Sequence, residues 1–117
     1  MSYIDGFVAA VPTANREIYR EHAAQAAILF KEHGALRVVE GWGDDVPDGK
    51  VTSFPMAVKR QPDETVVFAW IEWPSKAVRD EGMARAASDP RMPRDRQSMP
   101  FDGMRLIYGG FATLLDV

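Results

Sequence analysis

The order of apolar and polar positions predicts four strands in this chain. Alternation with a period of two, combined with many β-branched and aromatic residues, is typical of a pleated strand with a buried face. Segments of this kind are YIDGFVAAV (3–11), ALRVVEGW (35–42), ETVVFAWIEW (64–73) and MRLIYGGFATLL (104–115). The third is the strongest of these, because its valines, isoleucine and aromatic residues favour a buried, pleated environment.

A helix is predicted between the first two strands. In NREIYREHAAQAAILFKEH (15–33) apolar residues recur at spacings of three and four, which places them on one helical face. Thr13 or Asn15 can cap the first turn, and Gly34 suits the position after the last turn. The alanines of this helix indicate close packing on a sheet.

A second helix and a weaker extended segment complete the pattern. KAVRDEGMARAAS (76–88) follows Ser75, a suitable N-cap, and ends before the Asp89-Pro90 pair. VTSFPMAV (51–58) is extended in character, but Pro55 cannot donate a hydrogen bond to a neighbouring strand. We therefore expect 51–58 to be an edge strand.

This order of elements predicts an α+β protein with a ferredoxin-like fold. It corresponds to βαββαβ with an extra edge strand, an antiparallel sheet and two helices on one face. Residues 1–117 are expected to form a single domain, with an irregular, proline-broken loop over 92–100. Such a sheet leaves its other face uncovered, and a large apolar face is an association surface. We therefore expect a homodimer.

The composition narrows the classes of partner. A chain of 117 residues, 46% of them hydrophobic, can bury a core, and a net charge of −3 offers no broad positive field for nucleic acid. No apolar stretch approaches the roughly twenty residues of a membrane-spanning helix, and the N-terminus lacks the pattern of a secretory signal. The absence of cysteine excludes disulfides and suits a reducing compartment. We expect a cytoplasmic protein with neither nucleic acid nor membrane as partner.

Three aspartates lie close together in GWGDDVPDGK (41–50). A calcium loop of the EF-hand type needs oxygen ligands at its third and twelfth positions, where a loop beginning at Asp44 has Val46 and Pro55. The run Pro47-Asp48-Gly49 instead suits a tight turn, because proline fixes φ and glycine accepts a positive φ. We expect a turn here and no metal site.

Carboxylates on the predicted strands are candidates for acid–base chemistry. If Phe7, Trp42 and Trp70 share one face of the sheet, strict alternation adds to that face Asp5, Glu40, Phe68 and Glu72. Carboxylates grouped beside tryptophans would have raised pKa values, because desolvation and like-charge repulsion disfavour ionisation. The alternative is structural, with each carboxylate in water or paired with an arginine such as Arg37 or Arg105.

The histidines show no recognisable site pattern. His22 and His33 lie on nearly the same side of the first helix without a metal-binding spacing, so we expect them to be partly buried or capping residues. The sequence also lacks a nucleophile elbow, a phosphate-binding glycine loop and a dinucleotide fingerprint. Neither a metal nor a cofactor is expected.

Longer segments resemble one family: YIDGFVAAVP (3–12), LFKEHGALRVVEGWGDDVPDGKVTSF (29–54), VVFAWIEWPSKAVRD (66–80), DPRM (89–92) and MPFDGMRLIYGGF (99–111). Together they resemble the YbaA-like family of small bacterial proteins over nearly the whole chain. The resemblance implies a dimeric α/β-barrel, in which two ferredoxin-like subunits press their sheets together. This wider group includes cofactor-free monooxygenases, haem-degrading enzymes and proteins without a known reaction, so fold alone names no chemistry. No catalytic residue is carried over from it.

Two functions are consistent with these features. The first is binding of a small planar or aromatic molecule in a cavity between sheet and helices, with metal-free acid–base or oxygenase-like chemistry as its extension. The second is a non-catalytic dimeric module for structural or stress-response interactions. A pocket containing a carboxylate favours the first, and carboxylates paired with arginine favour the second. The ligand-binding candidates are Trp42, Phe68 and Trp70, and the catalytic candidates are Asp5, Glu40, Glu72 and Tyr108.

Overall fold

The computed structural model describes residues 1–93 and 99–117, so that residues 94–98 of the expected loop lie outside the described part. The strands are β1 (Tyr3–Pro12), β2 (Arg37–Trp42), β3 (Glu64–Trp73) and β4 (Ile107–Ala112). The α-helices are α1 (Arg16–Glu32), α2 (Phe54–Ala57) and α3 (Lys76–Ser88). Two short 3-10 helices are η1 (Thr13–Asn15) and η3 (Gly103–Arg105).

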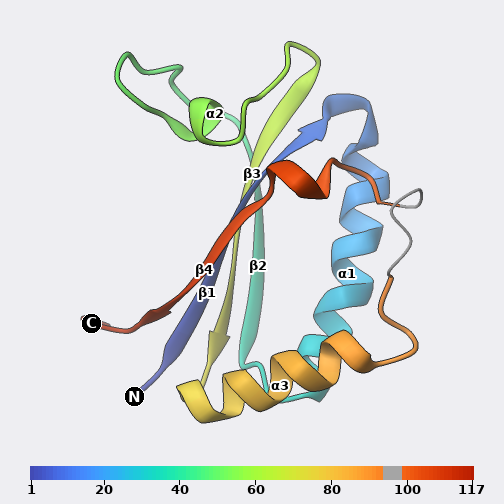
Figure 1. Cartoon of the computed structure of the whole chain (residues 1–117), viewed down its shortest axis with the longest axis vertical. Coiled ribbons are helices and arrows are strands. Elements are labelled where there is room, and N and C mark those ends of the chain that lie inside the picture. The colour runs from blue at the N-terminus through green and yellow to red at the C-terminus, as the bar shows by residue number, and fades with distance from the viewer. Residues whose placement is uncertain (94–98) are drawn as a thin grey trace.

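The strands form one antiparallel sheet in the order β2-β3-β1-β4. β1 pairs with β3 along its whole length, from Tyr3 opposite Trp73 to Pro12 opposite Glu64. β4 lies on the other side of β1, and β2 lies on the other side of β3. Figure 1 shows α1 beside this sheet and α3 across the end where both chain termini lie. Strand order and helix placement are those of a ferredoxin-like fold, which confirms the predicted fold class.

Alternation along the strands gives the sheet two different faces. The helix face carries the side chains that point toward α1 and α3, namely Asp5, Phe7, Ala9, Val11, Val38, Glu40, Trp42, Val67, Ala69, Ile71 and Trp73. The open face carries the alternate set, namely Ile4, Gly6, Val8, Val66, Phe68, Trp70, Glu72, Ile107, Gly109 and Phe111.

Trp73 anchors both long helices at one end of the helix face. It is fully buried, and Phe30 of α1 packs edge-on against it with ring centroids 6.5 Å apart. Gly82 lets α3 approach from the other direction, because a Cβ there would lie 2.6 Å from a ring carbon of Trp73. A side chain at Gly82 would therefore clash with Trp73.

The expected edge strand over 51–58 is wrong, because this segment contains the short helix α2. Ser53 caps the helix by accepting a hydrogen bond from the backbone N–H of Met56 at 3.1 Å, and Pro55 lies in the first turn. Proline suits that turn because its missing N–H would have no helical partner there. The buried Val58, just after the helix, packs against β1 and β3 at one end of the open face.

The last strand is shorter than the expected 104–115, because its first residues form η3. The pairing of β4 with β1 continues through Gly109 and Gly110 without a bulge. A Cβ on Gly110 would lie 2.6 Å from the hydroxyl of Tyr3 and 2.7 Å from Nη2 of Arg79. Gly110 therefore leaves room for the side chains of Tyr3 and Arg79.

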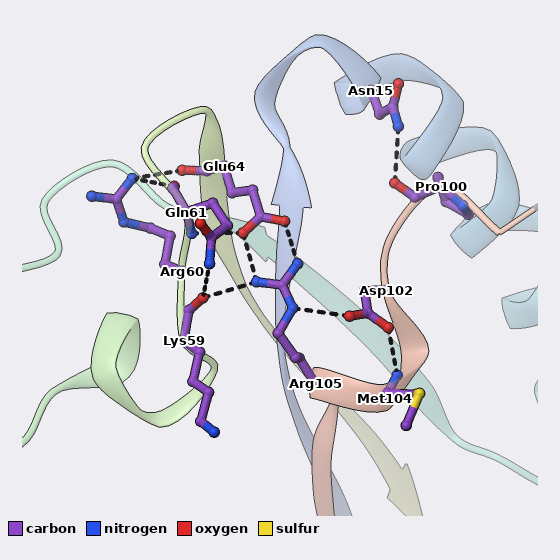
Figure 2. A network of polar contacts seen from close by, with 9 residues as sticks. All are labelled: Asn15, Lys59, Arg60, Gln61, Glu64, Pro100, Asp102, Met104 and Arg105. Atoms are coloured by element: carbon purple, nitrogen blue, oxygen red, sulfur yellow. Dashed lines mark hydrogen bonds and ion pairs between the residues drawn. The ribbon is translucent and has the colours of Figure 1, made fainter.

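A polar network fastens the segment before β4 to the rest of the fold (Figure 2). The guanidinium of Arg105 donates to both carboxylate oxygens of Glu64 at 2.7 and 2.6 Å, and also to the carbonyl oxygen of Lys59. These hydrogen bonds hold the pKa of Glu64 below its ordinary value. Nearby, the side chain of Asn15 donates to the carbonyl oxygen of Pro100 and makes no capping bond to α1. Arg105 is thus a structural ion-pair residue.

Candidate functional site

A groove of about 390 Å³ runs between α1 and the β2 side of the helix face. Its helix wall consists of Arg16, Glu17, Tyr19, Arg20, Ala23, Ala24 and Ala27, and its sheet wall of Val38, Glu40, Gly41, Trp42 and Val67. The alanines leave open the space that larger side chains would fill. This volume lies within the range of small-molecule binding sites.

Tyr19 and Glu40 meet across the middle of the groove. The Tyr19 hydroxyl donates to Oε1 of Glu40 at 2.6 Å, which links α1 to β2. Although Glu40 is partly exposed to solvent, desolvation raises the pKa of its carboxyl group, and the hydrogen bond from Tyr19 opposes that shift. Desolvation and the neighbouring carboxylate also raise the pKa of Tyr19. Tyr19 therefore stays protonated and donates, and Glu40 accepts.

Trp42 forms one end of the groove together with Arg16. The guanidinium carbon of Arg16 lies 5.7 Å from the centre of the Trp42 ring, which is a cation–π distance. The ring centroid of Tyr19 lies 6.5 Å from that of Trp42, and the two ring planes are tilted by 50°. Of the predicted ligand-binding residues, Trp42 is the one that lines this groove.

A smaller cavity of about 250 Å³ adjoins the groove and shares Tyr19 and Glu40 with it. Its deeper wall is mostly apolar and includes Phe101, whose ring lies edge-on to His22. The Nε2 atom of His22 is buried without a hydrogen-bond partner among the described residues, and desolvation lowers the pKa of the imidazole. The predicted partial burial of His22 is confirmed, and His33 lies at the C-cap of α1, 3.3 Å from Asp89.

Asp5 belongs to a buried ion pair and lies outside the groove. Its carboxylate accepts hydrogen bonds from Arg79 at 2.7 to 3.2 Å and from the indole N–H of Trp73 at 2.9 Å. The residue is 3% exposed, and the Arg79 guanidinium also lies over the Tyr3 ring. Of the two predicted alternatives for Asp5, the geometry is that of the structural ion pair.

The prediction that Phe68, Trp70 and Glu72 share a face with Asp5, Glu40 and Trp42 is wrong. Phe68, Trp70 and Glu72 lie on the open face, whereas the other three lie on the helix face. In the pairing of β2 with β3, Trp42 stands opposite Val67 and not opposite Trp70. The indole N–H of Trp70 donates to Glu72 at 3.0 Å, and Arg37 lies 3.7 Å from the same carboxylate. Both faces of β3 carry apolar residues, so alternation could not tell which one meets the helices. The sheet therefore separates Glu72 from Asp5 and Glu40.

Tyr108 is 75% exposed on the edge strand β4 and lines a different hollow, of about 580 Å³, which lies mainly on the open face. Phe68, Trp70, Ile107 and Phe111 line the same hollow. In the pairing of β4 with β1, Tyr108 stands opposite Phe7 of the helix face, so alternation places the side chains of Tyr108 and Phe68 on opposite faces of the sheet. Tyr108 does not line the groove that contains Glu40.

The aspartate cluster forms an irregular loop between β2 and α2. Gly49 has a φ of 68°, and a Cβ there would lie 2.4 Å from the carbonyl oxygen of Thr52. The tight turn expected at Pro47-Asp48-Gly49 is not formed, because these residues have an irregular conformation. No group of three histidine, aspartate or glutamate side chains placed to hold a metal ion occurs in the described part of the chain.

Arg16, Tyr19 and Ala23 are among the groove residues that were not predicted as site residues. Tyr19 and Ala23 lie within the segment 15–33, for which the sequence predicted only an apolar helical face. The sequence feature that could have indicated the groove is the change from a large residue, Tyr19, to the alanines at 23, 24 and 27. These small side chains leave a gap over β2. No sequence motif marks Arg16.

The fold and groove together define a ferredoxin-like α+β protein with a ligand-sized groove between its first helix and the sheet. Residues 2–103 match the family described as a protein of unknown function, DUF1428, and the chain belongs to that family. The uncharacterised protein YbaA of Escherichia coli K12 is 61% identical over 116 residues, covering 99% of each chain, and the same values hold for YbaA of Shigella flexneri. The predicted YbaA-like resemblance is confirmed.

A solved structure shares this fold at low sequence identity. It is a mutant form of SnoaB from Streptomyces nogalater, a cofactor-independent oxygenase, and it aligns with a TM-score of 0.63. The alignment covers 99% of this chain and 96% of that chain at 14% identity. At this identity the likeness shows a common fold. None of the helices that the structure describes is long and apolar enough to cross a membrane.

We predict that Asp5→Asn lowers the free energy of unfolding by about 3 kcal/mol, because the partly buried Arg79 loses the buried one of its two anionic partners. Urea denaturation measures this change. Asp80→Asn is the matched control, since Asp80 binds the same arginine from an exposed position, and it should have little effect. A change no larger in Asp5→Asn than in Asp80→Asn would contradict a structural role for Asp5.

Glu40→Gln should hold or raise the melting temperature at pH 7. The folded-state pKa of Glu40 is raised, so ionised Glu40 disfavours folding above that pKa, and the penalty disappears as the pH falls below the ordinary value of 4.5. The difference between mutant and wild type should therefore shrink in acid. Glu72→Gln, which weakens the contact with Arg37, should give no such gain. Lower stability of Glu40→Gln at pH 7 would make Glu40 a structural residue.

Proposed function

We propose that this protein binds a small planar or aromatic molecule in the groove between α1 and β2. The observation that carries the proposal is the Tyr19–Glu40 pair in the middle of a ligand-sized groove. In this pair the desolvated carboxyl group of Glu40 accepts a hydrogen bond from the Tyr19 hydroxyl at 2.6 Å. The predicted discriminator between the two functions was whether a carboxylate lies in a pocket or pairs with arginine. Glu40 meets the first condition, whereas Asp5 and Glu72 meet the second.

Acid–base chemistry at Glu40 is the extension of this proposal. A desolvated carboxylate is a stronger base than one in water, because its charged form is less well solvated. Tyr19 binds Oε1, and Oε2 has no hydrogen-bond partner among the described residues. Glu40 would accept a proton from an acidic O–H or C–H group of the bound molecule. Such a step needs no metal, and cofactor-independent oxygenation, the class to which SnoaB belongs, is one kind of chemistry that can follow it.

The open face supports self-association as a second part of the proposal. Phe68, Ile107 and Phe111 are 45%, 43% and 61% exposed there, around the hollow of about 580 Å³. An apolar surface of this kind needs cover, and a second copy of the chain supplies a complementary one by two-fold symmetry. In this assembly Phe68 and Trp70 are interface residues and Trp42 remains a groove residue. The absence of cysteine from the whole sequence supports a cytoplasmic location.

A screen of planar aromatic molecules by NMR tests the groove. Compounds that bind should shift the amide signals of Tyr19, Ala23 and Glu40. Ala23→Leu, which fills the groove, should abolish those shifts, whereas Ala84→Leu at an exposed position of α3 should not. Binding that survives in a folded Ala23→Leu variant would place the ligand elsewhere and contradict the proposal.

Sedimentation tests the self-association separately. The chain of 13.1 kDa should sediment as a dimer at micromolar concentration. Phe111→Glu should produce a folded monomer, because it places a charge in the proposed interface. Ile28→Glu adds the same charge at an exposed position of α1 and should leave the dimer intact. A wild-type protein that sediments as a folded monomer would exclude the dimer.

A further inference from the structure

Arg16 differs from the other arginines that the structure describes, because it has no carboxylate or carbonyl oxygen as a partner. The partners of the others are carboxylates for Arg20, Arg37, Arg79, Arg85, Arg91 and Arg105, and backbone carbonyls for Arg60. Arg16 instead stacks on Trp42 at the end of the groove. The contact with Trp42 therefore holds the charge of Arg16 at the groove. The N–H groups of its guanidinium have no hydrogen-bond partner among the described residues.

The wall of the groove along α1 changes from charged to apolar. Arg16 and Arg20 lie near the start of the helix, and Ala23, Ala24 and Ala27 follow on the same wall. At a rise of about 1.5 Å per residue, the wall from Arg16 to Ala27 is roughly 16 Å long. Val38 and Val67 face the alanines from the sheet. A flat molecule lying along the helix would thus meet apolar side chains at one end and a guanidinium at the other.

The other charges of the groove are already engaged. Glu17 pairs with Arg20 at 3.0 Å, and Glu40 accepts the Tyr19 hydroxyl in the middle of the groove. The N-terminus of α1 adds a partial positive charge beside Arg16. The free charge at this end of the groove is therefore positive.

From this arrangement we infer that the groove selects planar aromatic carboxylates, with the carboxylate on Arg16 and the rings between the alanines of α1 and Val38 and Val67. The inference rests on the proposed function, since it names the ligand class of the same groove. Guanidinium and carboxylate form paired, charge-assisted hydrogen bonds, which gives Arg16 specificity for this group over a neutral one of the same shape. Glu40 then lies beside the rings and away from the anionic end.

Titration calorimetry with 2-naphthoate and its neutral isostere 2-naphthamide tests the inference. The wild-type protein should bind 2-naphthoate about tenfold more tightly than 2-naphthamide, and added salt should reduce this ratio. Arg16→Gln should bring the ratio near one by weakening 2-naphthoate alone, and Arg16→Lys should give an intermediate ratio. Arg85→Gln, at an exposed arginine of α3, is the matched control and should keep the wild-type ratio.

The outcomes separate this inference from the proposed function. Equal affinity of the two compounds for the wild type would overturn the carboxylate class and leave the groove as a binding site. A preference for 2-naphthoate that persists in Arg16→Gln would assign the carboxylate to another residue and overturn the inference. Failure of both compounds to bind, together with no hit in the NMR screen, would overturn both proposals. Melting temperatures of the variants establish that each is folded, as expected for changes at the exposed Arg16.

Discussion

The buried carboxylate of Asp5 is the interaction on which the arrangement of the other elements depends. It receives the guanidinium of Arg79 from α3 and the indole N–H of Trp73 from β3, so that one side chain of β1 fixes two other elements. A buried charge is tolerated only when its hydrogen bonds are satisfied, which leaves α3 little freedom in its position. Gly110 follows from the same constraint, since a side chain there would displace Arg79. The end of the sheet, the path of α3 and the glycine of β4 are therefore consequences of one ion pair.

Asp5, Glu40 and Glu72 show how surroundings decide the role of a carboxylate. All three lie on strands of one sheet. Asp5 and Glu72 each have an arginine as a partner, whereas Glu40 has the hydroxyl group of Tyr19. An arginine holds a carboxylate in an ion pair, whereas Glu40 has a neutral donor in a desolvated place, and desolvation raises its pKa. The same kind of group is structural in two places and chemically available in the third.

The sequence was sufficient for the fold class because period and composition act over whole elements. Four strands and two long helices were predicted within a few residues, and Ser75 caps α3 as expected, accepting a hydrogen bond from Val78 at 3.2 Å. The error over 51–58 arose because proline is compatible with both a sheet edge and a first helical turn. The error over Phe68 and Trp70 arose because β3 is apolar on both faces, so that alternation gave no direction. Contacts such as Tyr19 with Glu40 depend on how α1 lies over β2, which no local pattern specifies.

The sheet separates the two proposed activities by geometry. A residue on the helix face cannot reach the open face through a strand, so β3 supplies Val67 to the groove and Phe68 and Trp70 to the opposite surface. A second copy covering the open face would leave the groove accessible, because the groove lies between α1 and β2. It would also prevent Phe68 and Trp70 from contributing to the ligand site of the same subunit. Ligand recognition must then rest on Trp42, Tyr19, Glu40 and the neighbouring Arg16, which all lie on the helix side of the sheet.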